Sequence, residues 1–139
     1  MNESLEAMIE RHEGCRFLPY PDSTEHWTIG IGHALHKPLT RAAVDQIFKD
    51  DLNDAINECL HAFPWFADLA LPRQYVLIDM CFNLGLPGLL KFKKFLAALA
   101  KEDYETAANE MIDSLWAKQV KGRALELADM MREVRELSA

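Results

Sequence analysis

Apolar residues recur with helical spacing at the start of the chain. Positions i, i+3, i+4 and i+7 of one helix face hold Leu5, Met8, Ile9 and His12. This spacing predicts an amphipathic helix, and Gly14 follows where a left-handed cap would end it. Glu13 would then lie in the last turn of that helix, beside whatever the next segment builds.

A turn and a short strand are predicted next. Residues 20–26 read Tyr-Pro-Asp-Ser-Thr-Glu-His, and proline, aspartate and serine are typical of turns. Residues 27–31, Trp-Thr-Ile-Gly-Ile, are rich in aromatic and β-branched side chains, which favour a strand. Glu13 and Asp22 therefore come from different elements, a helix end and a turn, and we expect them to face each other across a pocket.

The rest of the chain has helical periodicity. A long apolar stripe predicts a helix over about 40–62, with Thr40 as its N-cap. A nearly all-apolar run from Tyr75 to Leu84 predicts a buried central helix, with Pro72 in its first turn and its end at Gly85, Pro87 and Gly88. Three further helices are predicted. The first carries Phe92, Phe95, Leu96 and Leu99, and the second, with Asp103 as its cap, carries Ala107, Ala108, Met111, Ile112 and Leu115. The third follows Gly122 and carries Leu125, Ala128, Met131, Val134 and Leu137. The predicted fold class is α+β, mostly α, with one small β-hairpin near the N-terminus.

Composition and charge narrow the function classes. A chain of 139 residues fits one domain, and 27% charged residues with a net charge of −7 disfavour nucleic acid as a partner. Cys59 and Cys81 lie in apolar patterns and are expected to be buried thiols, not parts of a disulfide framework. No apolar run approaches the roughly 18 residues of a membrane span, and no signal-peptide pattern is seen. We therefore expect synthesis in the cytoplasm, with export by another component.

Two carboxylates of different surroundings suit the cleavage of a glycosidic bond. The acid needs a pKa raised by apolar neighbours, and its partner must stay ionised to activate water. Glu13, with Phe17 and Leu18 nearby in the sequence, fits the acid, while Asp22 in a polar turn fits the base. The hydroxyl of Thr28 would help to hold the attacking water. Spacing alone is also compatible with ordinary structural carboxylates.

One pattern makes the assignment more specific. Eight residues separate Glu13 from Asp22, and five separate Asp22 from Thr28, which runs into Gly-Ile-Gly-His at 30–33. In these residues, with Arg16, Tyr20, Leu39 to Asp51, Asp79 to Gly85 and Trp116 to Arg123, the chain resembles the phage-type lysozymes of glycoside hydrolase family 24. The resemblance implies a single lysozyme-like domain over 1–139. Its parts would be a small hairpin lobe over about 13–40, a connecting helix over about 40–62, and a helical lobe of about 63–139 plus the N-terminal helix, with a cleft between the lobes.

The resemblance also implies a reaction. The chain would be a muramidase that hydrolyses the β-1,4 bond between N-acetylmuramic acid and N-acetylglucosamine in peptidoglycan, with inversion and without a cofactor or metal. Glu13 would be the general acid, Asp22 would polarise the attacking water and Thr28 would position it. Inversion requires the two carboxyl groups to stand roughly 6.5–9.5 Å apart. The protein would act as a monomeric endolysin on the cell wall after release, which leads to host lysis.

Supporting residues follow from the same resemblance. Phe82 and Asn83 would line the sugar cleft, and Ala34 would lie at its edge. Arg123 would approach Glu13, where an ion pair would lower the pKa of the acid and oppose desolvation. His33 is expected to be a structural imidazole paired to a carboxylate or the backbone. The spacing of His26, His33 and His36 matches no usual metal-ligand pattern.

Departures from the family keep two alternatives open. Many relatives are strongly basic, whereas this chain is acidic, and only six residues separate His33 from Thr40, so the lobe over the cleft should be smaller. Ala34 replaces a larger apolar residue, and Phe95 replaces a small polar one. The first alternative is a catalytically weak or inactive lysozyme-fold module that binds or scaffolds peptidoglycan in a larger assembly. The second is a transglycosylase, which forms an anhydro product without water.

Overall fold

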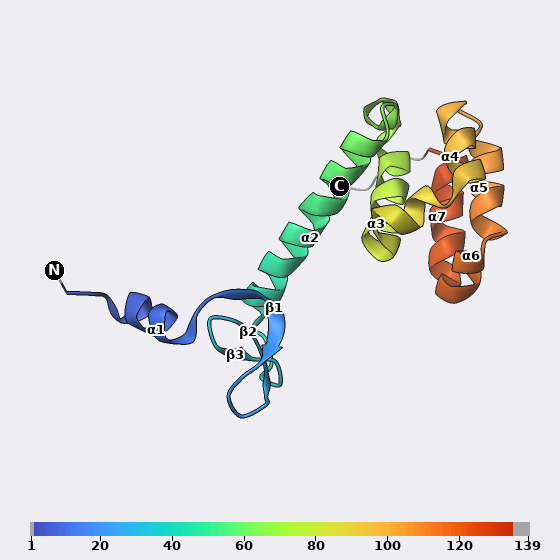
Figure 1. Ribbon diagram of the computed structural model, residues 1–139. Coiled ribbons are helices and arrows are strands. Elements are labelled where there is room, and N and C mark those ends of the chain that lie inside the picture. Colours follow the sequence, from blue (N-terminus) through green and yellow to red (C-terminus); the bar gives the residue numbers. More distant parts are fainter. Residues whose placement is uncertain (1, 135–139) are drawn as a thin grey trace. The chain divides into compact units, whose positions relative to one another are not determined.

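The computed structural model describes residues 2–134, so the predicted helix position Leu137 lies outside the described residues. By their contacts, the residues form two compact units, 1–45 and 46–139. The elements, labelled in Figure 1, are α1 (Leu5–Glu13), β1 (Arg16–Pro21), β2 (Trp27–Gly30), β3 (His33–Ala34), α2 (Arg41–Ala62), a short 3₁₀ turn at Phe66–Asp68, α3 (Leu71–Leu90), α4 (Lys93–Ala100), α5 (Tyr104–Ile112), α6 (Leu115–Val120) and α7 (Gly122–Arg132). The α+β fold class, mostly helical and lysozyme-like, is confirmed. The lobe boundaries and the cleft between lobes stay predictions.

The first predicted helix is confirmed at both ends. The Ser4 hydroxyl accepts from the Ala7 N–H at 3.1 Å and caps the start of α1. Gly14 ends the helix with a φ of 75°, and its N–H donates to the Glu10 carbonyl at 2.7 Å. Glu13 is therefore held on the last turn of α1, as the spacing predicted.

The strands form one antiparallel sheet in the order β1-β2-β3. Tyr20 pairs with Thr28, and Thr28 pairs with Ala34 on its other side. The predicted hairpin is confirmed, and β1 is its first strand, for which the sequence pattern gave no bounds. Its two prolines, Pro19 and Pro21, disfavour a strand, but β1 lies at the sheet edge, where a missing N–H is tolerated.

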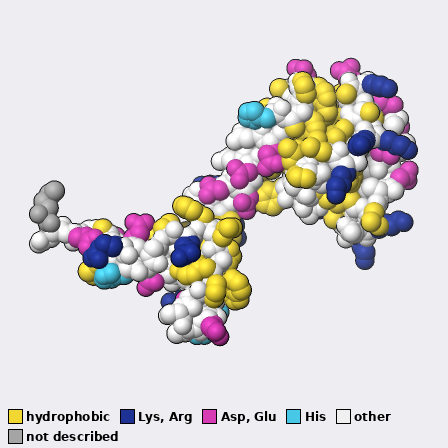
Figure 2. Space-filling view, viewed as in Figure 1, with side chains coloured by type: hydrophobic (Ala, Val, Ile, Leu, Met, Phe, Trp, Pro, Cys, Tyr) yellow, Lys and Arg dark blue, Asp and Glu magenta, His cyan; other side chains and the backbone are white. Residues whose placement is uncertain are grey.

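The hydrophobic core lies in the second unit. Figure 1 shows α4, α5, α6 and α7 gathered beside α3, the helix predicted to be central. Val76, Leu77 and Met80 of α3 are fully buried, and Cys59, Cys81 and Trp116 pack in the same cluster, as expected. In Figure 2, hydrophobic side chains gather on the visible face of this unit, with Lys and Arg side chains around them.

α3 continues past the residues predicted to end it. Gly85 adopts a left-handed φ of 74° and kinks the helix, but helical turns resume after it as far as Leu90. Proline is tolerated at Pro87 because it falls in the first turn after the kink, where its missing N–H has no helical partner. Within residues 2–134, no single helix is long and apolar enough to cross a membrane; α3 and α4 meet both conditions only together, as a pair bent by 102°.

One arginine ties three helices of the second unit together. Arg73 of α3 donates to the carbonyls of Met131 and Arg132 at 2.7 and 3.1 Å, which satisfies acceptors at the end of α7. Its guanidinium also lies 3.4 Å from the centre of the Tyr104 ring in α5.

We expect Arg73→Lys to lower the free energy of unfolding by about 2 kcal/mol, because an ammonium cannot make the forked contact or stack on the ring. Urea denaturation should show a lower midpoint with an unchanged slope. Arg41→Lys is the matched control, since its ion pair with Asp45 is exposed and contributes little. Equal midpoints for the two variants would contradict the assignment.

Candidate active site

The Asp22 carboxylate is the most heavily hydrogen-bonded group of the first unit. The chain turns at this residue, with the Glu25 N–H donating to the Asp22 carbonyl at 3.0 Å. Oδ1 of Asp22 accepts from the Thr24 N–H at 2.8 Å, the Thr24 hydroxyl at 2.8 Å and the His26 N–H at 2.9 Å. These hydrogen bonds hold the pKa of the Asp22 carboxyl below its usual value; the largest effect comes from the His26 N–H, and the next from the Thr24 hydroxyl and N–H. The polar turn expected around Asp22 is confirmed, and an ionised Asp22 suits a base.

A hydrogen bond to His26 holds Thr28 beside this turn. Its side chain is 4% exposed, and its Oγ1 donates to the His26 carbonyl at 2.9 Å. The hydroxyl hydrogen is thereby used, so Oγ1 has only acceptor positions left for a further partner such as a water O–H. The small Ala34 lies directly opposite Thr28 in the ladder.

The Glu13 carboxyl packs against the backbone of Gly32. A Cβ built on Gly32 would lie 2.8 Å from Oε2 and 2.9 Å from Cδ of Glu13, closer than Cβ atoms come in real structures, so the carboxyl would have to move. Gly32 also has a φ of 69°, which side chains rarely adopt. The missing side chain of Gly32 therefore provides the space that the acid occupies, a role that the sequence analysis did not assign.

The apolar shelter expected from Phe17 and Leu18 is wrong. These side chains are 89% and 78% exposed, and the Glu13 residue is itself exposed. They lie on β1, an edge strand that packs on only one neighbour.

The two carboxylates belong to opposite ends of one ladder. Arg16, just after Glu13 and Gly14, pairs with Gly30, whereas Pro21, just before Asp22, pairs with Trp27. Glu13 and Asp22 therefore lie just outside the two ends of the β1–β2 pairing, and the separation of their carboxyl groups stays a prediction.

Three predicted site residues lie in the second unit. Phe82 and Arg123 line a groove of about 610 Å³ together with apolar residues of α2 and α3. Arg123 forms an ion pair with Asp79 at 2.6 Å, and its approach to Glu13 stays a prediction. Asn83 is exposed, but its Oδ1 accepts from the Trp116 indole N–H at 2.8 Å, so part of its hydrogen-bonding capacity is structural.

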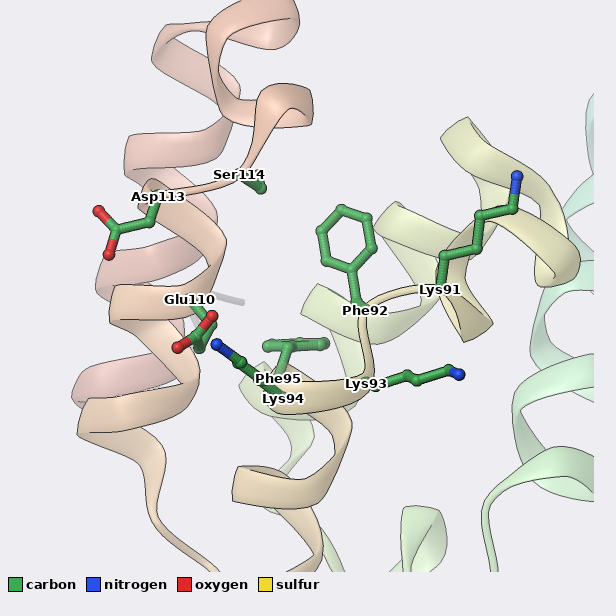
Figure 3. A pocket seen from close by; sticks show the side chains of 8 residues that line it. All are labelled: Lys91, Phe92, Lys93, Lys94, Phe95, Glu110, Asp113 and Ser114. Atoms are coloured by element: carbon green, nitrogen blue, oxygen red, sulfur yellow. The ribbon is translucent and has the colours of Figure 1, made fainter.

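Other hollows lack the predicted catalytic groups. Figure 3 shows one of about 420 Å³ between α4 and α5, where Phe92 and Phe95 line the wall and the polar ends of Lys94 and Glu110 point toward each other. His33 lines a hollow of about 540 Å³ in the first unit, with Arg16 and Thr40 among its neighbours.

Alternative chemistries find little support in side-chain placement. Burial raises the pKa of the Cys59 thiol to about 12, so it is not a nucleophile at neutral pH. The rings of His26 and His36 lie 6.0 Å apart. Within residues 2–134, no three His, Cys, Asp or Glu side chains group closely enough to hold a metal ion. The carboxylates of the first unit are thus the candidates for catalysis.

Comparison with known proteins assigns the family. Residues 10–134 match the phage lysozyme family, a range that contains Glu13, Asp22, Thr28 and every other predicted site residue. The chain belongs to the phage lysozyme family. It is 30% identical to the pre-baseplate central spike protein Gp5 of Enterobacteria phage T4 over 88% of this chain. It is 25% identical to the probable T4-type lysozymes 1 and 2 of Dictyostelium discoideum, with 89% of this chain and 91% of each relative covered.

The phage lysozyme assignment confirms the resemblance that the motif indicated and supports a peptidoglycan-cleaving glycoside hydrolase. The chain spans only 26% of the length of the phage T4 spike protein, whereas it spans almost the whole of the Dictyostelium relatives. Lysozyme chemistry also explains why a helix end and a turn would each carry a carboxylate. The residues that sequence reasoning missed are Gly32, Thr24 and His26; an Asp-x-Thr pattern in a turn was the available signal for the latter two.

Proposed function

We propose that this phage lysozyme is a muramidase, which hydrolyses the β-1,4 bond between N-acetylmuramic acid and N-acetylglucosamine in peptidoglycan. The observation that carries the proposal is the hydrogen-bonded Asp22, whose Oδ1 accepts from three donors, in the same compact unit as a Glu13 carboxyl that packs on Gly32. A metal or cofactor has no role in it.

Each residue has a distinct task in the proposed step. Glu13 protonates the glycosidic oxygen as the bond to the anomeric carbon breaks. Asp22, kept ionised by its hydrogen bonds, takes a proton from the attacking water, while the Thr28 oxygen accepts a hydrogen bond from the same water. Attack from the side opposite to the leaving group inverts the anomeric carbon.

The test of this function is the clearing of outer-membrane-stripped Gram-negative cells. We expect the wild-type protein to lower the turbidity of such a suspension and Glu13→Gln to leave it unchanged. Circular dichroism of both proteins controls for folding. Equal clearing rates for the two proteins would refute the proposed catalytic role.

A module within a larger assembly is the second candidate. The 30% identity to a phage spike protein supports it, and so does a net charge of −7, which weakens attraction to an anionic wall. Such a module binds glycan strands with little or no turnover. Co-sedimentation with purified peptidoglycan, without release of soluble fragments, would favour this candidate over the enzyme.

We further propose that the protein is synthesised in the host cytoplasm, acts on the cell wall after release, and functions as a monomer. Size-exclusion chromatography with light scattering tests the monomer. Fractionation of cells that express the protein, with and without a membrane-permeabilising component, tests the route: activity on the wall only with that component is expected. Activity on the wall without it would contradict this route.

A further inference from the structure

His26 connects the two residues that the proposed mechanism places around water. Its carbonyl accepts from the Asp22 N–H at 2.8 Å and from the Thr28 hydroxyl at 2.9 Å, and its own N–H donates to Asp22 Oδ1 at 2.9 Å. Its ring Nδ1 lies 2.8 Å from the Thr24 hydroxyl oxygen, which in turn lies 2.8 Å from Asp22 Oδ1. Hydrogen bonds therefore connect both the backbone and the side chain of His26 to Asp22.

The direction of these hydrogen bonds follows from the carboxylate. An ionised Asp22 only accepts, so the single hydrogen of the Thr24 hydroxyl points to Oδ1. The same hydroxyl oxygen can then only accept from the ring, which requires a hydrogen on Nδ1 of His26. Both the neutral Nδ1–H tautomer and the imidazolium meet this requirement, so the chain of donors holds in either ring state.

We propose that His26 is a positioning residue of the active site: through the Thr24 hydroxyl it holds Oδ1 of Asp22 and leaves Oδ2 for the attacking water. Within residues 2–134, every hydrogen bond to this carboxylate goes to Oδ1. The carboxyl plane is thereby fixed, and one oxygen stays available. The inference rests on the proposed function, because it assigns Asp22 the role of base.

The local backbone is shaped for this arrangement. Glu25 has a φ of 66°, an uncommon value for a residue with a side chain, and it turns the chain so that the His26 N–H reaches back to Asp22. The titratable groups around the carboxylate in this unit are Glu25 and His26 in the turn and His36, whose ring lies 6.0 Å from that of His26. A charge on His26 acts in the same direction as the hydrogen bonds, since it favours the ionised carboxylate.

Thr24→Val tests the relay, because it keeps the shape of the side chain and removes the hydroxyl. We expect kcat on purified peptidoglycan to fall about fivefold, the factor that corresponds to one ordinary hydrogen bond. The acidic limb of the pH–rate profile should also move to higher pH, since Asp22 loses a donor to its ionised form. Thr24→Ser should restore both values, and Ser23→Ala, in the same turn but without a hydrogen bond to the described residues, is the matched control.

His26 is tested by a pair of variants. Asn offers an amide N–H near the position of Nδ1 and does not titrate, so His26→Asn should keep the acidic limb near its wild-type position. His26→Leu should shift this limb to higher pH, as Thr24→Val does. Identical limbs for His26→Leu, Thr24→Val and the wild type would overturn the proposal.

A measurement independent of turnover separates this inference from the proposed function. The ¹³C NMR titration of the Asp22 carboxyl should move to higher pH in Thr24→Val and in His26→Leu but not in Ser23→Ala. If the wild-type protein releases no fragments while the titration still shifts, the hydrogen-bond relay holds and the muramidase assignment fails. If fragments are released but the titration is unchanged by both variants, the assignment holds and the relay fails.

Discussion

Glu13→Gln is expected to lower kcat for peptidoglycan cleavage by about 10²- to 10⁴-fold, the range that a general acid contributes. Glutamine keeps the size of the side chain and its seat on Gly32, but it has no proton to give to the leaving oxygen. KM should change little, because the amide fills the same space. Initial rates of reducing-end release over a range of peptidoglycan concentrations measure both constants.

The control for this variant is its stability. Within residues 2–45, the Glu13 side chain makes no ion pair or hydrogen bond, so the thermal midpoint of Glu13→Gln should match that of the wild type. A large fall in kcat with an unchanged thermal midpoint would show that the substitution affects the chemical step and not the fold. A kcat within a few-fold of the wild type would mean that another group donates the proton.

Gly32→Ala is expected to lower kcat by about 10²-fold, the size of effect that a displacement of about 1 Å produces in a catalytic geometry. The new Cβ would lie 2.8 Å from Oε2 of Glu13, so the carboxyl has to leave its seat. The positive φ of Gly32 adds roughly 1–2 kcal/mol of destabilisation. The same kinetic assay, with thermal unfolding alongside it, measures the two effects separately.

Gly30→Ala is the matched control for that prediction. Gly30 has nearly the same φ, 67°, but a Cβ there meets no atom within 4 Å. Both variants should lose similar stability, while only Gly32→Ala should lose most of its activity. Similar kcat values for the two would show that backbone strain, and not the seat of the acid, limits turnover.

Elements with a strong local signal could be predicted from the sequence. The i, i+3, i+4 spacing and Gly14 locate α1 to the residue, and Thr40 caps α2 through the Ala43 N–H at 3.2 Å, as expected. Asp103 likewise caps α5 by accepting from the Thr106 N–H. In each case, the determining contacts lie within four residues, so a local pattern contains them.

Features that depend on distant residues were missed. β1 holds its place through pairing with β2, although two prolines argue against a strand. The kink at Gly85 ends the helical φ and ψ for one residue, and packing of Leu89 into the core continues the helix beyond it. α5 ends at Ile112 and α6 begins at Leu115, although Leu115 was expected to lie inward on the helix after Asp103; its side chain is 70% exposed.

The residues of the candidate site likewise fall into those that a local pattern locates and those that depend on contacts formed by the fold. The motif located Glu13, Asp22 and Thr28 at a helix end, a turn and a strand, as the structure has them. It did not indicate that His26 joins Asp22 and Thr28 through three hydrogen bonds, or that the Glu13 carboxyl packs on Gly32, because both depend on how the turn and the sheet fold back. The ion pair of Arg123 with Asp79 is also a contact between segments far apart in the sequence.

The most direct test of the central claim is the mass of the muropeptides that the protein releases from purified Gram-negative peptidoglycan. Hydrolysis by Glu13 and Asp22 predicts fragments that end in a reducing N-acetylmuramic acid, with one water added for each bond cut, and predicts no such fragments from Glu13→Gln. Fragments that end in the anhydro sugar, or equal release by the wild type and Glu13→Gln, would contradict the account.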